Sequence, residues 1–354
     1  MACPPRLDPD RLGRAVAVVR ESVQRGEAPA AVLAVANSRE TVCCEAFTRP
    51  GGDIVAADTI FLLASISKPI LATAVLQLAE EGQLVLSEPV ARYIPELATP
   101  ATSSVTAWHL LTHTSGIAEV TWPETVRQRP AVAVGLDPAR RMPLRFVPGA
   151  RFAYSTLSFY LLAELITRLG GQPYPEYLRE RIFAPLAMAD TSFDPRAAGA
   201  RVAPVHGIDP DGALGDEEAV RYFISLAMPG AGLWSTAADL VAFGQAMLND
   251  GQRGDGRLLS PPFMELMTRD HTGSIATTTK DEPSTHYGLG WYKRSLEGWL
   301  PGSPRVFEHG GATGCRLWID PDWDLVYVYL TNGFNLDSHA QVAALQAVYG
   351  AFVG

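Results

Sequence analysis

Cysteine is scarce in this sequence, and its spacing predicts neither a disulfide framework nor a metal centre. The four cysteines are Cys3, the neighbours Cys43 and Cys44, and Cys315, with no C-x-x-C pattern in the 354 residues. Reduced thiols in a reducing compartment are the simplest interpretation. The first residues also lack the basic start and the apolar core of a signal peptide. Both observations predict a cytoplasmic protein.

Long apolar runs and clusters of basic residues are absent as well. No stretch of the sequence reaches the roughly 20 apolar residues that a membrane-spanning helix needs. The 29 Lys and Arg against 38 Asp and Glu give a net charge of -9, without any basic block. These features argue against a nucleic-acid partner and against an anionic membrane surface. The G-x-S-x-G pattern of the α/β-hydrolases is also missing.

What is present is a globular composition and an order of elements typical of a mixed fold. Hydrophobic residues make up 47% of the chain and charged residues 19%, so a large core can form. The spacing of apolar residues predicts a first helix over 8–25, and two β-branched runs, 30–36 and 41–47, predict a hairpin. Strand patterns return towards the other end, over 287–293, 305–308, 315–319 and 325–331, before a last helix over 339–352.

The middle of the chain is mainly helical in pattern, with many prolines in the connections. Helices are predicted over 105–113, 156–169, 174–183 and 235–248. The sequence therefore predicts the α/β (α+β) class, with an antiparallel sheet that both chain ends build and helices that flank it. We expect residues 1–86 and 249–354 to form this sheet lobe and residues 87–248 an inserted helical lobe. A functional site is expected between the two lobes.

One stretch near the start of the chain has the strongest pattern for chemistry. Ser65 and Lys68 form an S-x-x-K pattern ahead of an apolar segment that predicts a buried helix. Pro69 fits only in the first turn of that helix, which puts Ser65 at or just before the N-terminus. Unpaired N–H groups there favour developing negative charge, and Lys68 lies one turn along on the same face. A serine beside a desolvated lysine is typical of nucleophilic catalysis, although the pattern also occurs by chance.

Two later stretches could complete a site for acyl transfer. Tyr154 lies between a loop and a helix, and a phenol beside an ammonium has a lowered pKa that suits proton transfer. The alternative is an ordinary half-buried tyrosine. Gly310 and Gly311 follow a predicted strand, where glycines let a substrate approach the backbone, or simply form a turn. The N–H groups near Gly311 and Ala312, with that of Ser65, could hold an oxyanion.

In combination and order, these stretches resemble the serine β-lactamase and penicillin-binding-protein superfamily, nearest to its class C-like branch of esterases and D-amino-acid peptidases. The resemblance covers roughly residues 30–331. It rests on Ser65-Ile66-Ser67-Lys68, Leu110-Leu111-Thr112-His113-Thr114-Ser115-Gly116, Pro148-Gly149 leading to Tyr154-Ser155, Gly232-Leu233-Trp234-Ser235-Thr236, Tyr287-Gly288-Leu289-Gly290-Trp291 and His309-Gly310-Gly311.

The resemblance implies a covalent acyl-enzyme. Ser65 would be the nucleophile, and Lys68 and Tyr154 would share the general acid and base role. The N–H groups of Ser65 and Ala312 would form the oxyanion hole. His309, Gly310 and Gly311 occupy the family's Lys-Thr-Gly-type strand motif and would contact the substrate.

Two departures from the family pattern bear on the substrate. Thr156 replaces the asparagine of the family's Tyr-x-Asn motif, and its shorter side chain cannot offer two-sided amide pairing. His309 in place of lysine removes a fixed positive charge that would attract a substrate carboxylate. Both changes favour a carboxylesterase acting on small or secondary-metabolite esters. The alternatives are an acyltransferase, transesterase or cyclase of this fold, then a β-lactamase or D-amino-acid peptidase. A silent binding protein is the non-enzymatic alternative.

The remaining predictions concern the pocket and its ligands. The proline- and arginine-punctuated stretch 118–149 is long for a loop, and we expect it to line the pocket with Trp122, opposite Trp234. His109 and His113 are four residues apart, but no acidic residue lies between them as in a metalloprotease. We therefore expect a small-molecule ester or acyl substrate as partner, and no metal or cofactor.

Overall fold

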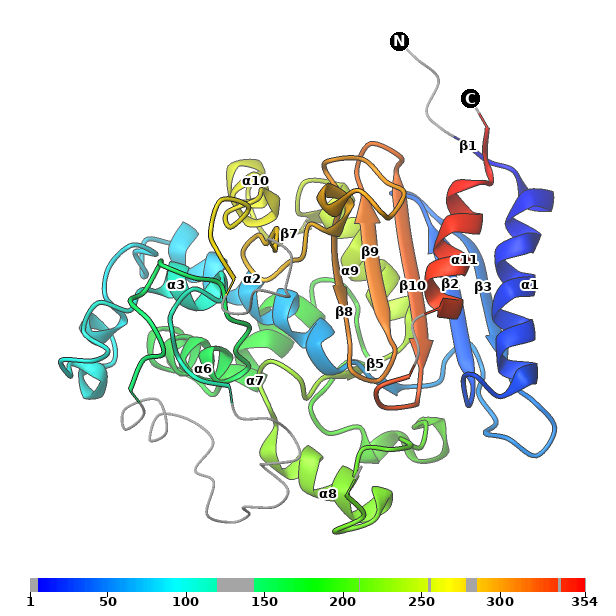
Figure 1. Cartoon of the computed structure of the whole chain (residues 1–354), viewed down its shortest axis with the longest axis horizontal. Coiled ribbons are helices and arrows are strands. Elements are labelled where there is room, and N and C mark those ends of the chain that lie inside the picture. The colour runs from blue at the N-terminus through cyan, green and yellow to red at the C-terminus, as the bar shows by residue number, and fades with distance from the viewer. Residues whose placement is uncertain are drawn as a thin grey trace.

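The computed structural model describes residues 6–119, 143–209, 211–253, 256–277, 285–336 and 339–353. Its centre is a five-stranded antiparallel sheet in the order β3-β2-β10-β9-β8 (Figure 1). These strands are β2 (Ala31–Ala36), β3 (Thr41–Phe47), β8 (Phe307–Gly310), β9 (Arg316–Asp320) and β10 (Leu325–Thr331). Both ends of the chain thus build one sheet, as predicted.

Helices cover both faces of the sheet (Figure 1). Along β2, Leu33 packs in one cluster with α1 (Pro9–Arg25) and α11 (His339–Tyr349), and Val32 packs in another with α2 (Ser67–Glu80) and α9 (Ala237–Leu248). Successive strand residues point to opposite faces. Because helices cover both faces, β2 and β10 need apolar residues along their whole length. All residues of both strands are buried.

The buried helix predicted after Ser65 is α2, and 12 of its 14 residues are buried. It packs against α6 (Leu157–Gly170), so it lies between the sheet and the helical lobe (Figure 1). A 3-10 turn over Ala64–Ile66 precedes it and holds Ser65. Pro69 is in the first turn of α2, where its missing N–H leaves no carbonyl unpaired. The position predicted for Ser65 is confirmed.

The other helices are α3 (Ala107–Leu111), α7 (Tyr174–Leu178) with a π-helical turn over Arg179–Phe183, α8 (Asp216–Leu226) and α10 (Pro261–Thr268). Short strands form the pairs β1 (Arg6–Leu7) with β11 (Phe352–Val353), β4 (Phe61–Leu62) with β5 (Trp234–Ser235), and β6 (Gln252–Arg253) with β7 (Gly256–Arg257). Within the described ranges, no helix combines the length and apolarity needed to cross a bilayer. The lobe boundaries stay a prediction, and the packing of α9 on β2 and β10 favours an end of the helical lobe before Ala237.

The strand predicted over 287–293 is wrong. This segment makes only single bridges, between Tyr287 and Tyr292 and between Tyr292 and Glu308. The N–H of Gly288 donates to the carbonyl of Trp291 at 2.7 Å and closes a tight turn. Gly290 has φ +86°, and a Cβ there would lie 2.7 Å from the Cβ of Ala72 in α2. Glycine is therefore required for the chain to turn directly against α2.

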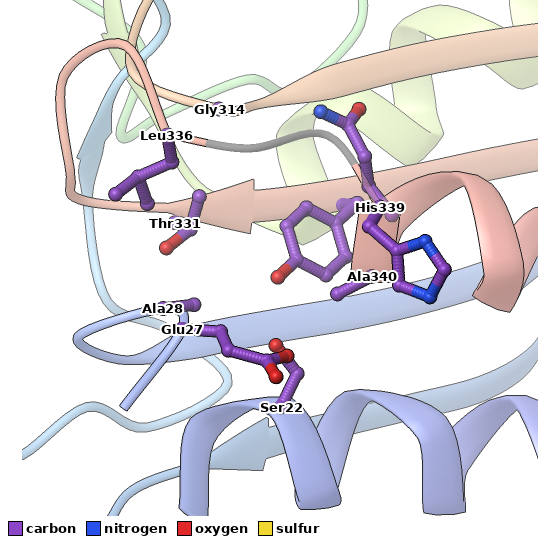
Figure 2. A pocket seen from close by; sticks show the side chains of 10 residues that line it. Ser22, Glu27, Ala28, Gly314, Thr331, Leu336, His339 and Ala340 are labelled. Carbon is purple, nitrogen blue, oxygen red and sulfur yellow. The ribbon is translucent and has the colours of Figure 1, made fainter. Parts of the chain in front are cut away.

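A small cavity of about 180 Å³ lies between the end of α1 and the start of α11 (Figure 2). Ser22 and Glu27 line it from the α1 side, His339 from α11, and Tyr329 and Thr331 from β10. Tyr329 packs in the cluster with α1 and α11 rather than in the cluster with α2. The sheet therefore separates this cavity from Ser65.

Candidate active site

Ser65 and Lys68 meet at the start of α2. The Lys68 ammonium nitrogen, Nζ, lies 3.1 Å from Ser65 Oγ. Ala64, directly before Ser65, has φ +47°, a left-handed conformation that is strained for a residue with a side chain. Ser67 fixes the same turn, since its hydroxyl donates to the Ala64 carbonyl at 2.7 Å. The nucleophile candidate is thus held in a rigid and strained backbone.

Lys68 is completely buried and lies among three oxygen atoms. Besides Ser65 Oγ, its Nζ donates to the Gly230 carbonyl at 2.9 Å and to Thr156 Oγ1 at 3.4 Å. A Cβ on Gly230 would lie 2.9 Å from the Cβ of Phe159, so only glycine fits there. Burial lowers the pKa of Lys68 to about 7, against the opposing effect of the Glu119 carboxylate. A substantial fraction of the amine is therefore neutral near pH 7 and able to accept a proton.

The carboxylate of Glu119 acts electrostatically on Lys68. It accepts a hydrogen bond from the backbone N–H of Thr156, the residue that begins α6. A carboxylate is favoured at a helix N-terminus because unpaired N–H groups converge there. Glu119 thus carries a negative charge close to Lys68 and Tyr154, and its charge raises the pKa of both.

Tyr154 reaches the same serine from the other lobe, but its electrostatics differ from the prediction. Its phenol is in hydrogen-bonding reach of the Ser65 side chain. Lys68 Nζ lies over the face of the tyrosine ring, 4.7 Å from the centroid, and not beside the hydroxyl. Burial therefore dominates and raises the pKa of Tyr154 well above its usual value, with a further increase from Tyr292. The predicted lowering of the pKa is wrong, and Tyr154 is a neutral hydrogen-bonding phenol.

The glycine-rich turn after β8 packs directly against the segment that carries Ser65. A Cβ on Gly311 would lie 2.3 Å from the Leu63 carbonyl oxygen, so a side chain is excluded at this contact. Thr313 Oγ1 donates to the Leu62 carbonyl at 2.7 Å and fixes the turn in place. The N–H of Ala312 donates to no backbone carbonyl in the part of the chain that the structure describes. Ala312 is exposed, and the preceding Gly311 packs against Leu63 and Ala64, so the Ala312 N–H is available as an oxyanion donor.

A buried chain of hydrogen bonds runs behind Tyr154, through His113, Tyr287 and His309. The N–H of Ser155 donates to His113 Nδ1 at 3.0 Å, so the proton of this neutral ring lies on Nε2. His113 Nε2 is 3.3 Å from the Tyr287 hydroxyl, which is itself 3.3 Å from His309 Nε2. His309 Nδ1 lies 2.8 Å from the Gly310 carbonyl and must donate to it. All donors therefore point in one direction, from Ser155 towards Gly310.

Both imidazoles of this chain are neutral. Burial lowers the pKa of His113 and of His309 well below the usual range, and the positive charge of Lys68 lowers both further. The His113 ring packs on the Tyr154 ring with centroids 4.3 Å apart, so the chain also orients Tyr154. His309 is 1% exposed and both its nitrogens are engaged. This argues against the direct substrate contact that we predicted for the His309 side chain.

The structure brings some of the other predicted site residues to Ser65 and Lys68, but not all of them. Thr156 contacts Lys68, Gly310 accepts from His309, and Gly311 packs against Leu63 and Ala64, directly before Ser65 in the chain. Trp234 is completely buried in β5, within an apolar cluster, which argues against direct contact with a substrate. Trp122 lies outside the described residues.

Sequence reasoning missed several residues around Lys68 and Tyr154. Gly230 and Glu119 carried no recognisable pattern, because a carbonyl acceptor and a helix-terminal carboxylate depend on tertiary packing. Tyr292 stacks parallel to Tyr154 at 6.2 Å and touches the His309 ring at 5.1 Å between centroids. Its position after Gly-Leu-Gly-Trp was the one available signal. Among the described residues, no group of three or more His, Cys, Asp or Glu is arranged to hold a metal ion.

Comparisons with known proteins agree with this geometry. A family model described as Beta-lactamase matches residues 15–351. Penicillin-binding protein 4 of Amycolatopsis lactamdurans is 32% identical over 297 residues, which cover 80% of this chain and 75% of that protein. Esterase EstB of Burkholderia gladioli is 30% identical over 342 residues and 85% of each chain.

The fold also matches solved structures. One of them, EstCE1, a hydrolase with promiscuous acyltransferase activity, superposes with a TM-score of 0.79 at 20% identity, over 96% of this chain and 99% of that one. The resemblance inferred from the sequence motifs is confirmed. The chain belongs to the beta-lactamase family and is a serine hydrolase of the β-lactamase and penicillin-binding-protein fold.

Proposed function

We propose that this protein is a carboxylesterase that forms an acyl-enzyme at Ser65. The observation that carries the proposal is the buried Lys68 amine, 3.1 Å from Ser65 Oγ and with a pKa of about 7. An amine that is partly neutral at physiological pH can accept the serine proton, whereas a solvated lysine cannot.

The reaction follows from the placement of the groups. Lys68 accepts the proton of Ser65 while Oγ attacks the ester carbonyl, and the N–H groups of Ser65 and Ala312 hold the resulting oxyanion. The bond to the alcohol then breaks, and the alcohol oxygen takes its proton from the Lys68 ammonium, while the neutral Tyr154 hydroxyl donates a hydrogen bond to the same oxygen. Water attacks the acyl-enzyme in the second half with the same groups, and the carboxylic acid leaves.

Two features favour an ester over a β-lactam or a peptide. Thr156 stands at the position of an amide side chain, so a substrate amide has no paired donor and acceptor there. His309 is neutral, so this position offers no fixed cation to a substrate carboxylate. The 30% identity to a protein named as an esterase supports the same conclusion.

Intact-protein mass spectrometry tests the proposal. The protein is incubated separately with short p-nitrophenyl esters, a β-lactam and a fluorophosphonate, with Ser65→Ala as the matched variant. We expect an acyl or phosphonyl adduct that Ser65→Ala lacks, and turnover of the esters well above that of the β-lactam.

Other outcomes separate the alternatives. A higher rate with the β-lactam would replace the esterase by a β-lactamase or peptidase. Faster product formation on addition of an alcohol or amine acceptor would indicate acyl transfer. No adduct from any of the three reagents would leave a binding protein without catalysis.

A further inference from the structure

A groove lined by residues of the segment 287–294 contains Lys293, which with Lys68 is one of two buried lysines among the described residues. The groove has a volume of about 670 Å³ and lies between the end of α9, α10 and the start of β8. Its apolar wall includes Met247, Met264 and Phe307, all nearly completely buried. Lys293 lines the groove and is 4% exposed.

The backbone of Lys293 is held in place, whereas its side chain has no partner. Its N–H donates to the His286 carbonyl at 2.9 Å, and its carbonyl accepts from Leu296 at 3.0 Å. Across the described ranges, the ammonium makes no hydrogen bond and no ion pair. The ammonium is open to the groove, and burial of the side chain lowers its pKa to about 8.

Carboxylates lie near Lys293, but other donors already engage them. Asp270 accepts from the His286 ring at 2.6 Å and from two backbone N–H groups. Asp320 accepts from Ser303 and from the Tyr349 hydroxyl, and Asp322 pairs with Arg305 at 3.0 Å. Their charges raise the pKa of Lys293 through space, but none of the three forms an ion pair with its ammonium. The three N–H donors of its ammonium are therefore available to a group that enters the groove.

A second cation lines the same groove. Arg269 at the end of α10 is exposed, and its guanidinium makes no ion pair within the described part of the chain. Two exposed acids, Asp250 and Glu265, also line the groove and would repel an anion bound close to them. The half-buried Asp270 and the exposed Arg305 line it as well, but Asp270 is held by the His286 ring and Arg305 pairs with Asp322. The anion is therefore expected between Lys293 and Arg269, away from the two exposed acids.

We infer that this groove is a binding site for a small organic anion with an apolar body, whose carboxylate or phosphate head pairs with Lys293 and Arg269. The apolar wall accommodates the body, and the Lys293 ammonium at the groove gains an ion-pair partner. This inference does not depend on the proposed reaction at Ser65. Tyr292 and Lys293 follow the tight turn: the Tyr292 ring stacks on Tyr154 in the active site, whereas Lys293 lines the groove.

Isothermal titration calorimetry on the full chain tests the site with three probes that carry the same eight-carbon tail: nonanoate, octyl phosphate and octylamine. We expect one or both anions to bind and octylamine not to bind. Lys293→Met keeps the length of the side chain but removes its charge, and should weaken anion binding at least about ten-fold. Lys293→Arg keeps the charge and should retain binding. Ser65→Ala and Arg221→Gln, a change at a distant exposed ion pair, should leave binding unchanged.

A labelling experiment covers the case in which Lys293→Met fails to fold. The chain has three lysines, Lys68, Lys280 and Lys293, so acetylation by an amine-reactive ester can be assigned by peptide mass. The bound anion should slow acetylation of Lys293 and not that of Lys280. Equal binding of octylamine, full binding by Lys293→Met, loss of binding in Ser65→Ala, or no anion binding at millimolar concentration would each overturn the inference.

Discussion

Lys68 and Lys293 are both buried, yet their surroundings differ in one decisive respect. Lys68 Nζ contacts three oxygen atoms of the protein, whereas Lys293 Nζ contacts none among the described residues. Burial lowers the pKa of both, to about 7 and about 8. Burial alone thus makes a lysine a weaker base, and the partners decide its use. In the proposed reaction Lys68 exchanges a proton with its partner Ser65, whereas the Lys293 ammonium is proposed to bind an anionic ligand.

The composition of the chain agrees with this distinction. Only three of its 29 basic residues are lysines, and the rest are arginines. Arginine stays protonated at any physiological pH, so it can hold a charge but cannot accept a proton. Arginine is used at almost all basic positions. Lysine, whose compact amine can lose its proton, occupies the two buried positions Lys68 and Lys293.

The largest expected effect comes from replacing Lys68 by arginine. Lys68→Arg should reduce the acylation rate about 10²- to 10⁴-fold, because a guanidinium cannot act as a base. Lys68→Ala should lose a similar factor. Stopped-flow measurement of the p-nitrophenol burst gives the rate, and circular dichroism checks the fold. Lys293→Arg serves as the matched control and should acylate at the normal rate. If Lys68→Arg retained near-normal acylation, Lys68 would not be the base.

The pH dependence of kcat/KM is the next largest effect. The neutral amine is the active form, so kcat/KM should fall about ten-fold per unit below pH 7 and level off above it. Glu119 raises the pKa of Lys68, so Glu119→Gln should move the profile to lower pH while the amide oxygen still accepts the Thr156 N–H. Lys293→Met should leave the profile unchanged. A shift to higher pH in Glu119→Gln would contradict the assignment.

A smaller effect is expected from the hydrogen-bond chain that orients Tyr154. Tyr287→Phe removes the middle link and leaves His113 Nε2–H and His309 Nε2 without partners. We expect a loss of about 1–3 kcal/mol in the free energy of unfolding and a fall of about ten-fold in acylation. Denaturant titration and burst kinetics measure the two. Tyr327→Phe, which removes one buried hydrogen bond on the opposite face of the sheet, should lose stability but not acylation rate.

The smallest effect concerns the third oxygen around Lys68. Thr156→Asn places an amide where the family motif has one and keeps an acceptor for Lys68. The ratio of ester to β-lactam turnover should fall by a factor of about three to ten, the range of one added hydrogen bond. Thr156→Val, which lacks any acceptor, is the comparison. An unchanged ratio in Thr156→Asn would show that Thr156 does not set the preference for esters.

Much of the fold was predictable because its signals are local. Pro69 limits where α2 can begin, and this constraint alone placed Ser65 correctly. The strands of the sheet follow from their β-branched runs. The segment 287–293 misled because its apolar pattern is that of a strand, whereas the turn depends on Gly290 meeting Ala72, a contact distant in sequence.

The electrostatics of the site could not be predicted from sequence. The direction of the Tyr154 pKa shift depends on burial and on Lys68 lying over the ring face. Lys293 was likewise missed, because the sequence does not show that Asp270 and Asp320 are engaged elsewhere. The contact of Trp122 with the substrate stays a prediction.

The division of the central sheet between the two ends of the chain has a consequence during synthesis. Ser65 is translated well before the turn with Gly311 and Ala312, which packs against Leu63. Strand β10, which pairs with β2, follows later still. A ribosome-bound chain that has not reached these strands therefore has its serine and lysine but no complete oxyanion site. The activity of this hydrolase should therefore appear only after the segment through β10 has been translated and has joined the sheet.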